Sequence, residues 1–245
     1  MLAENYPQQL SPELLDLYQE GMSARLHISL TARFDETCTL DVVSGIGANA
    51  EIGEDVVVKA GVFLGNNVNV VGRTILEKGV KITDGFSINP GAYFAEGARV
   101  APRKTKATRH SYMRIALDSV IIGPNVVLPT EVQLGKKAVI PTTDSIAEIG
   151  RYGTSRRMVT AYGSAKEPLY SVGCQYGIGI ARFKDRVAKN TGTEPKSAAD
   201  YAKHMPEIEA LGITVQAAYE REANLIDELR AQRKEAFAQA RLNRL

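Results

Sequence analysis

The residues best suited to binding chemistry lie in one basic stretch near the middle of the chain, between Pro102 and Arg114. The stretch holds no acidic residue, so an anionic ligand such as a nucleotide would meet groups of a single charge there. Tyr112 lies beside these charges and can stack on a base. The candidate ligand-binding residues are Arg103, Lys104, Lys106, Arg109, Tyr112 and Arg114. The stretch predicts an anion-binding loop, with an ordinary solvated loop as the alternative.

The elements that must position this loop show an apolar residue at every sixth position. A period of six fits neither a helix, with about 3.6 residues per turn, nor a half-buried strand, with a period of about two. A second column of smaller residues lies two positions earlier, as at Ala50, Val56 and Val62. The main column is Ile46, Ile52, Val58, Leu64, Val70, Leu76, Ile82, Ile88, Phe94 and Val100. This pattern predicts a solenoid in which short strands and turns stack coil upon coil.

The six-residue column extends back to Ile28, which makes thirteen hexads up to Val100. It then breaks and resumes at Ile122, a step of 22 residues that is not a multiple of six. A segment must therefore be extruded between these two points, and the basic stretch falls inside it. Later hexads continue through Ile140 and toward Ile146.

The sequence predicts a helical cap, a solenoid with an extruded loop, a small ββα module and C-terminal helices. Their boundaries are 1–27 for the cap, 28–149 for the solenoid with its loop at 101–118, 150–192 for the module and 193–245 for the helices. In the module, strands are expected at 158–162 and 169–174, followed by a helix that ends at Gly192. A last helix is expected over 214–245 and should pack on a trimer partner or on a neighbouring domain.

Composition limits the classes of function. The 245 residues carry a formal net charge of +2, with 44% hydrophobic and 24% charged residues, as in a soluble globular protein. The nearly balanced charge argues against extended nucleic acid as a partner. There is neither an apolar run of about 20 residues nor a basic start followed by one, so we expect no membrane span and no cleaved signal. Cys38 and Cys174 lie far apart and are expected to be reduced thiols in a cytoplasmic setting.

The hexads IGANAE, IGEDVV, VKAGVF and LGNNVN, which begin at Ile46, resemble those of the left-handed β-helix family of hexapeptide-repeat proteins. The resemblance covers about half of the chain and implies a mainly β fold, a left-handed parallel β-helix with three hexads in each triangular coil. Thirteen hexads then make about four coils, and the later ones about another coil and a half. Because the prism of this family usually assembles as a trimer, the resemblance also implies a homotrimer.

A second resemblance covers 147–211, which is similar to a small C-terminal module found behind hexapeptide-like arrays in phage and prophage proteins. Gly173 and Cys174 at a strand end, with Phe183 and Val187 in the following helix, carry this likeness. The longer linker after that helix and the added final helix depart from the module. The resemblance brings no chemistry and implies a phage origin, with a location in the host cytoplasm or in a phage particle.

The family contains both zinc-dependent carbonic anhydrases and acyltransferases. The first activity needs three imidazoles on one metal, but His27, His110 and His204 lie before the prism, in the loop and in a late helix, so no metal is expected. In some of the acyltransferases a loop histidine acts as general base, which implies that role for His110 with acyl-coenzyme A as cofactor. Arg109 and its basic neighbours would then hold the phosphates of coenzyme A.

Three functions stay open at this point. We favour a non-catalytic trimeric binding or assembly protein of phage type, without a cofactor, whose loop engages an anionic ligand or partner. The alternative is an acyl-coenzyme-A-dependent acyltransferase with His110 as base. A purely structural spacer of a phage particle would need only the stiffness of the solenoid. In the expected trimer, the basic loop would lie at the grooves between subunits. Arg151, Arg156 and Arg157 form a second basic cluster, which is a candidate for the same groove.

Overall fold

The structure is a computed structural model that describes most of the chain after residue 26. The described residues are 27–29, 32–35, 37–41, 45–101, 113–115, 119–129, 132–155, 157–172 and 175–242. The helix expected in the N-terminal cap lies outside them.

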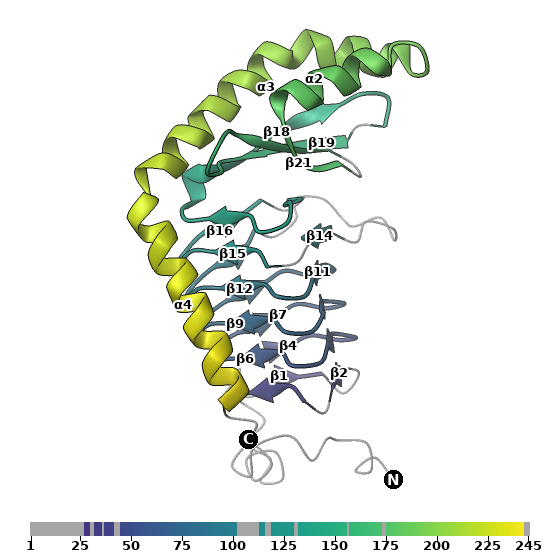
Figure 1. The fold of residues 1–245 in the computed structure, drawn as a ribbon. Helices are drawn as coiled ribbons and strands as arrows, with labels where there is room; N and C mark the ends of the chain where they lie inside the picture. Colours follow the sequence, from purple (N-terminus) through teal and green to yellow (C-terminus); the bar gives the residue numbers. More distant parts are fainter. Residues whose placement is uncertain are drawn as a thin grey trace.

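Three parallel sheets form the walls of a prism, and the chain passes from one wall to the next in six-residue steps (Figure 1). Sheet A contains β1 (His27–Ile28), β4 (Gly45–Ile46), β7 (Phe63–Leu64), β10 (Lys81–Ile82), β13 (Arg99–Val100) and β16 (Val127–Leu128). Sheet B contains β2 (Arg33–Phe34), β5 (Glu51–Ile52), β8 (Asn69–Val70), β11 (Phe86–Ile88) and β14 (Met113–Ile115). Sheet C contains β3 (Thr39–Leu40), β6 (Val57–Val58), β9 (Ile75–Leu76), β12 (Tyr93–Phe94), β15 (Ile121–Ile122) and β17 (Val139–Ile140).

Consecutive coils stack in register at a spacing of 18 residues. Leu64 pairs with Ile46 on one side and with Ile82 on the other, and both interior columns predicted from the sequence are buried. Backbone hydrogen bonds join the coils, as where the Phe63 N–H donates to the Val80 carbonyl at 2.8 Å. This pairing confirms the predicted fold: it is a parallel solenoid of about five turns that fits a left-handed β-helix.

The corners of the prism hold residues that accept a left-handed backbone. Asn49 and Asn67 both have φ of 55°, and the Asn67 N–H donates to the Ala48 carbonyl of the neighbouring coil at 2.7 Å. Asparagine tolerates this region better than most residues because its short polar side chain bonds locally. At Gly47 the reason for glycine is steric, because a Cβ there would collide with the backbone of Asn66 on the next coil.

The break in the hexad column corresponds to one long coil. In sheet B, Ile88 pairs with Ile115, a step of 27 rather than 18 residues, so nine extra residues lie between β13 and β14. The next coil returns to the regular step, because Ile122 pairs with Ile140. The extra residues therefore precede the sheet B strand of this coil in the sequence, and residues 113–115, which were predicted to be part of the loop at 101–118, belong to the wall.

An antiparallel sheet, sheet D, closes the C-terminal end of the prism (Figure 1). It follows a short 3₁₀ helix, η1 (Thr143–Ser145), and consists of β18 (Ile146–Tyr152), β19 (Arg157–Tyr162), β20 (Leu169–Val172) and β21 (Gln175–Gly179). Two of these strands were expected, and β18 and β21 were not. Tyr162 is fully buried in the core of the prism, where its hydroxyl accepts a hydrogen bond from the Gly135 N–H at 2.7 Å. Burial raises the pKa of Tyr162, so this hydroxyl stays protonated.

Two helices pack against sheet D, α2 (Ile180–Lys189) and α3 (Pro195–Arg221). The expectation of a separate last helix starting at residue 214 was wrong, because α3 continues through Gly212 to Arg221. A Cβ on Gly212 would collide with the hydroxyl of Tyr170, so this glycine allows α3 to lie close to sheet D rather than ending a helix. None of the described helices is long and apolar enough to cross a membrane.

The last helix, α4 (Ala223–Leu242), runs along the outside of sheet C toward the N-terminal coils (Figure 1). It covers one outward apolar side chain from each of five coils, and these are Val57, Ile75, Tyr93, Ile121 and Val139. Ile226 and Leu229 of α4 are buried in this contact. The helix thus packs on a neighbouring domain of its own chain, which is one of the two arrangements expected.

Polar contacts fix the position of α4 on the prism. The Arg233 guanidinium donates to the Gly91 carbonyl from Nε at 3.3 Å and from Nη2 at 2.9 Å, and it lies 4.9 Å from the centre of the Phe237 ring. Under the helix, burial raises the pKa of Tyr93 to about 12, and the Glu77 carboxylate adds to the shift.

Cys38 is a free thiol buried in the interior of the prism. Burial raises its pKa to about 11, with the Asp35 carboxylate adding to the shift. The thiolate, which is the reactive form, is therefore scarce at neutral pH. Cys174 lies outside the described residues.

Leu229→Ala should lower the free energy of unfolding by about 2–5 kcal/mol, because it removes a fully buried side chain from the contact between α4 and sheet C. Urea denaturation followed by circular dichroism measures the change. Leu242→Ala is the matched control on the same helix, since Leu242 is 62% exposed, and it should change the value by less than about 0.5 kcal/mol. Equal losses in the two variants would contradict the packing of α4 on the prism.

Tyr162→Phe should destabilise the protein by about 1–3 kcal/mol, because it leaves the buried Gly135 N–H without its acceptor. Faster amide hydrogen exchange at Gly135 reports the same loss locally. Tyr176→Phe, which removes a hydroxyl from a partly exposed ring on β21, serves as control. Unchanged protection of Gly135 would show that sheet D does not close the prism through this bond.

Candidate functional site

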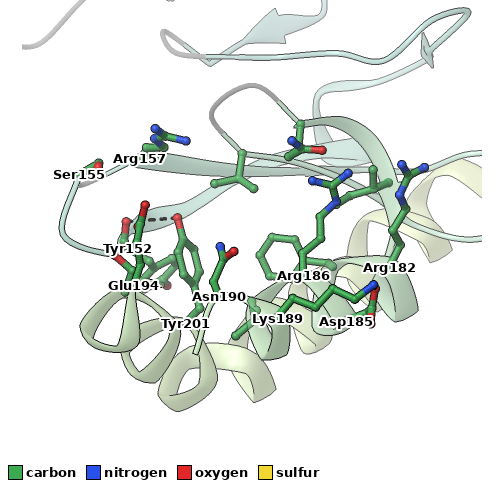
Figure 2. A pocket seen from close by; sticks show the side chains of 17 residues that line it. Tyr152, Ser155, Arg157, Arg182, Asp185, Arg186, Lys189, Asn190, Glu194 and Tyr201 are labelled. Atoms are coloured by element: carbon green, nitrogen blue, oxygen red, sulfur yellow. Dashed lines mark hydrogen bonds and ion pairs between the residues drawn. The ribbon is translucent and has the colours of Figure 1, made fainter. Parts of the chain in front are cut away.

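A cavity of about 590 Å³ lies between sheet D, α2 and the start of α3 (Figure 2). Its volume is in the range typical of small-molecule sites, about 300–1,000 Å³. The walls come from β18, β19, β20 and β21 on one side and from the two helices on the other. The cavity is therefore built from the C-terminal part of the chain and not from the prism.

Helix α2 supplies one wall because it is strongly amphipathic. Phe183 is 2% exposed and packs with the core under sheet D, which orients the helix. Arg182 and Arg186 are four residues apart and therefore share another face. Figure 2 shows their guanidinium groups directed from the helix toward the strands. Lys189 also lines the cavity, but its Nζ is paired with the Asp185 carboxylate at 2.8 Å.

Arg157, at the start of β19, brings a third guanidinium to the opposite end of the cavity (Figure 2). The acidic lining residues are Asp185, which is paired with Lys189, and Glu194. Among the described residues, no carboxylate forms an ion pair with Arg157, Arg182 or Arg186. The cavity is thus a concentration of positive charge whose hydrogen-bond donors are not taken up by carboxylates of the described chain.

The floor of the cavity is a set of aromatic rings packed edge to face. The Phe183 and Tyr201 ring centres are 5.9 Å apart at an angle of 84°, and those of Tyr152 and Tyr201 are 6.0 Å apart at 62°. The Tyr201 hydroxyl donates to the Tyr152 carbonyl at 3.2 Å (Figure 2). Burial raises the pKa of Tyr201, and nearby Arg157 opposes the shift. These contacts make the floor rigid and apolar.

The turn after β18 holds the start of α3 in place. The Gly153 N–H donates to the Asp200 carboxylate at 2.8 Å, and the Thr154 N–H donates to the Ser197 hydroxyl at 3.0 Å. Gly153 has φ of 73°, and a Cβ there would press on the Tyr201 ring and on Ser197, so glycine is required on both grounds. The cavity walls therefore have fixed relative positions.

His204 is the one histidine whose side chain the structure describes, and it is not among the residues that line the cavity. Its ring lies 4.7 Å from that of Tyr152, with Nδ1 at 3.3 Å from Glu207 and Nε2 at 3.8 Å from Asp200. His27 belongs to β1. Within the described ranges, no group of three or more His, Cys, Asp or Glu side chains is arranged to hold a metal ion.

Most of the residues predicted to bind a ligand lie outside the described part of the chain. These are Arg103, Lys104, Lys106, Arg109, His110 and Tyr112. Arg114 belongs to strand β14, where its backbone pairs with Ser87. Their roles stay predictions. In the second basic cluster, Arg157 lines the cavity, Arg151 is exposed on β18 and is not among the lining residues, and Arg156 lies outside the described residues.

Arg182 and Arg186 were not among the site residues predicted from the sequence, although their spacing of four residues was visible there. The helix was expected from its apolar positions, and the two arginines, four residues apart, necessarily share a face of it. A paired arginine face on a short helix that packs on a sheet is a candidate anion site. Its meeting with Arg157 depends on the fold of sheet D, since β19 and α2 are separated by two strands.

No protein-family model matches the chain, and no curated protein matches it. Among solved structures, it is similar to a proposed acetyltransferase from Bacillus cereus, at 15% identity and a TM-score of 0.27, over 71% of this chain and 90% of that one. It is also similar to the UDP-N-acetylglucosamine O-acyltransferase of Moraxella catarrhalis, at 13% identity and a TM-score of 0.24, over 78% of this chain and 95% of that one.

A third similar structure is a variant of the GDP-perosamine N-acetyl transferase of Caulobacter crescentus in complex with CoA and GDP-perosamine. The identity is 15% and the TM-score 0.24, and the match covers 52% of this chain and 58% of that one. The present chain thus spans little more than half the length of that enzyme. The activities in these names belong to those proteins, and the function of this chain has to be argued from its own cavity.

Proposed function

We propose that this protein binds an anionic small molecule, a phosphorylated compound such as a nucleotide, in the cavity between sheet D and α2. The sequence also predicted an anionic ligand, with the loop at 101–118 as its binding site. The cavity is a second candidate site for such a ligand. The observation that carries it is the presence of Arg157, Arg182 and Arg186 in one cavity without a carboxylate partner among the described residues.

The chemistry of the arginines suits an oxyanion such as phosphate. Guanidinium groups present planar pairs of N–H donors that match two oxygens of a phosphate, and such charge-assisted bonds are about twice as strong as neutral ones. Some arginines elsewhere in the described chain do pair with carboxylates, as Arg230 does with Asp227 at 2.9 Å. Leaving three of them without such a partner in one cavity keeps their donors available to a ligand.

The rest of the cavity suits the organic part of such a ligand. The Tyr201 ring is partly exposed and offers apolar surface, and Asn190 and Glu194 lie at the same end as Tyr201 (Figure 2). Amide and carboxylate groups of this kind select ligands by their hydroxyl or amino groups. The arrangement supports a phosphorylated ligand whose polar body lies near Asn190 and Glu194.

The homotrimer, the phage origin and the placement in a phage particle remain predictions from the sequence. Sheets A and B are the walls on which a trimer would have to form, because α4 of the same chain already covers sheet C. The acyltransferase alternative also remains a prediction, since it depends on His110. It requires catalysis in addition to binding, so the two functions make different measurable claims.

Arg186→Gln should weaken the binding of inorganic phosphate and nucleotides roughly tenfold to a hundredfold, because it removes a charged donor worth about 1.5–3 kcal/mol. Isothermal titration calorimetry measures the affinity, and Arg182→Gln and Arg157→Gln should act in the same direction. Arg241→Gln is the control, as it removes the same charge from an exposed position on α4. Loss of affinity only in the control, or no binding to the wild type, would contradict the cavity as the site.

If the protein binds without turnover, acyl-coenzyme A should be held by its phosphates and should release no free thiol in the presence of acceptor sugars or amines. A colorimetric thiol assay checks this, with His110→Ala beside the wild type. Thiol release by the wild type that His110→Ala abolishes would replace the binding function by the acyltransferase alternative.

A further inference from the structure

Two further hollows lie along the edge of sheet D, and each shares lining residues with its neighbour. A hollow of about 450 Å³ shares Gln175, Ile178 and Arg182 with the cavity. A third, of about 310 Å³, shares Lys136 and Leu169 with the second. These shared residues place the three hollows next to one another in a row from α2, over β21, to the last coil of the prism, and this row is called the path below.

This path is lined by positive charge beyond the arginines of the cavity. Among the described residues, the wall of the second hollow has Arg182 and Lys136 and no carboxylate. The third adds Lys137 and Lys166, and Glu167 is its acidic lining residue. An anion longer than a single phosphate would meet a basic side chain at each stage of such a path.

The lining favours a bare chain of phosphates over a single-stranded nucleic acid. Binding of single strands needs open aromatic faces on which bases stack. The rings of the cavity are instead packed against one another, and Phe183 is 2% exposed. The second hollow has one ring, Tyr176, in its wall.

We propose that this path is a binding groove for a linear oligophosphate, whose first phosphate lies at Arg186 and whose following phosphates extend past Arg182 to Lys137 and Lys166. The proposal rests on the proposed function, since the groove begins in the same cavity. It specifies the ligand class as a chain of several phosphoryl groups, either inorganic or carried on a nucleoside.

Calorimetry with orthophosphate, pyrophosphate, tripolyphosphate and a longer polyphosphate tests the groove on the full chain. Affinity should rise with each added phosphate until the groove is filled. The double variant Lys137→Asn with Lys166→Gln should bind the longer polyphosphate about tenfold more weakly. It should bind orthophosphate and tripolyphosphate with unchanged affinity, because three phosphates that start at Arg186 are too short to cross the second hollow. Asn is chosen at position 137 because Lys137 has φ of 59°, which Asn tolerates.

The matched control is the double variant Lys203→Gln with Lys234→Gln, which removes two exposed charges from α3 and α4 and should change none of the affinities. Circular dichroism establishes that each variant is folded. Arg186→Gln should weaken every member of the series.

The outcomes separate the groove from the cavity. Equal affinity for orthophosphate and the long chain would overturn the groove and leave the cavity, whereas no binding of any phosphate would overturn the proposed function. Equal weakening by both double variants would also overturn the groove, as would tighter binding of an oligonucleotide than of a polyphosphate with the same charge. The longer polyphosphate and a nucleoside that carries a phosphate chain of the same length are compared to identify the source, and binding of either with the predicted Lys137 and Lys166 dependence supports the groove.

Discussion

The structure depends on the stacking of one coil on the next. Each inward side chain lies on the one 18 residues earlier, and each strand donates backbone hydrogen bonds to the neighbouring coil. Such a stack satisfies its interior but leaves an end coil with exposed apolar side chains and unpaired backbone groups. At the C-terminal end this demand is met by sheet D, where Tyr162 fills the core and accepts a hydrogen bond from Gly135.

The same demand organises the helices. Sheet C has apolar residues on its outer side as well as its inner side, so it needs a cover, and α4 supplies it. Because α3 and α4 follow one another with a single break at Glu222, the helix that covers the prism also extends the helix that packs on sheet D. Helix α3, whose first residues line the cavity, packs on sheet D, and α4, which follows it, packs on sheet C. Both contacts hold the wall of the cavity that α3 provides.

The cavity brings several positive charges, unpaired among the described residues, into one hollow. On the described part of the prism, three pairs of opposite charges join neighbouring coils, as Lys59 and Glu77 do at 2.9 Å. In the cavity, Lys189 and Asp185 form such a pair, and the three arginines do not. Like charges gathered in a hollow repel one another and cost stability, a cost that a bound anion would remove. This is the physical reason to regard the cavity as a binding site.

The hexad column predicted the prism because its information is local and repeated. Every coil needs the same inward apolar residues, so ten successive positions of the column agree from Ile46 to Val100. The outward residues Val57, Ile75 and Tyr93 recur every 18 positions, but the covered wall was not predicted from them. What covers it was decided by contacts such as that of Arg233 with Gly91, which are 142 residues apart and leave no periodic trace. For the site, the sequence by itself determined the paired arginines of α2 through helical spacing. Only the tertiary structure brought Arg157 to them, because strand order in sheet D is set by long-range packing and not by any local pattern.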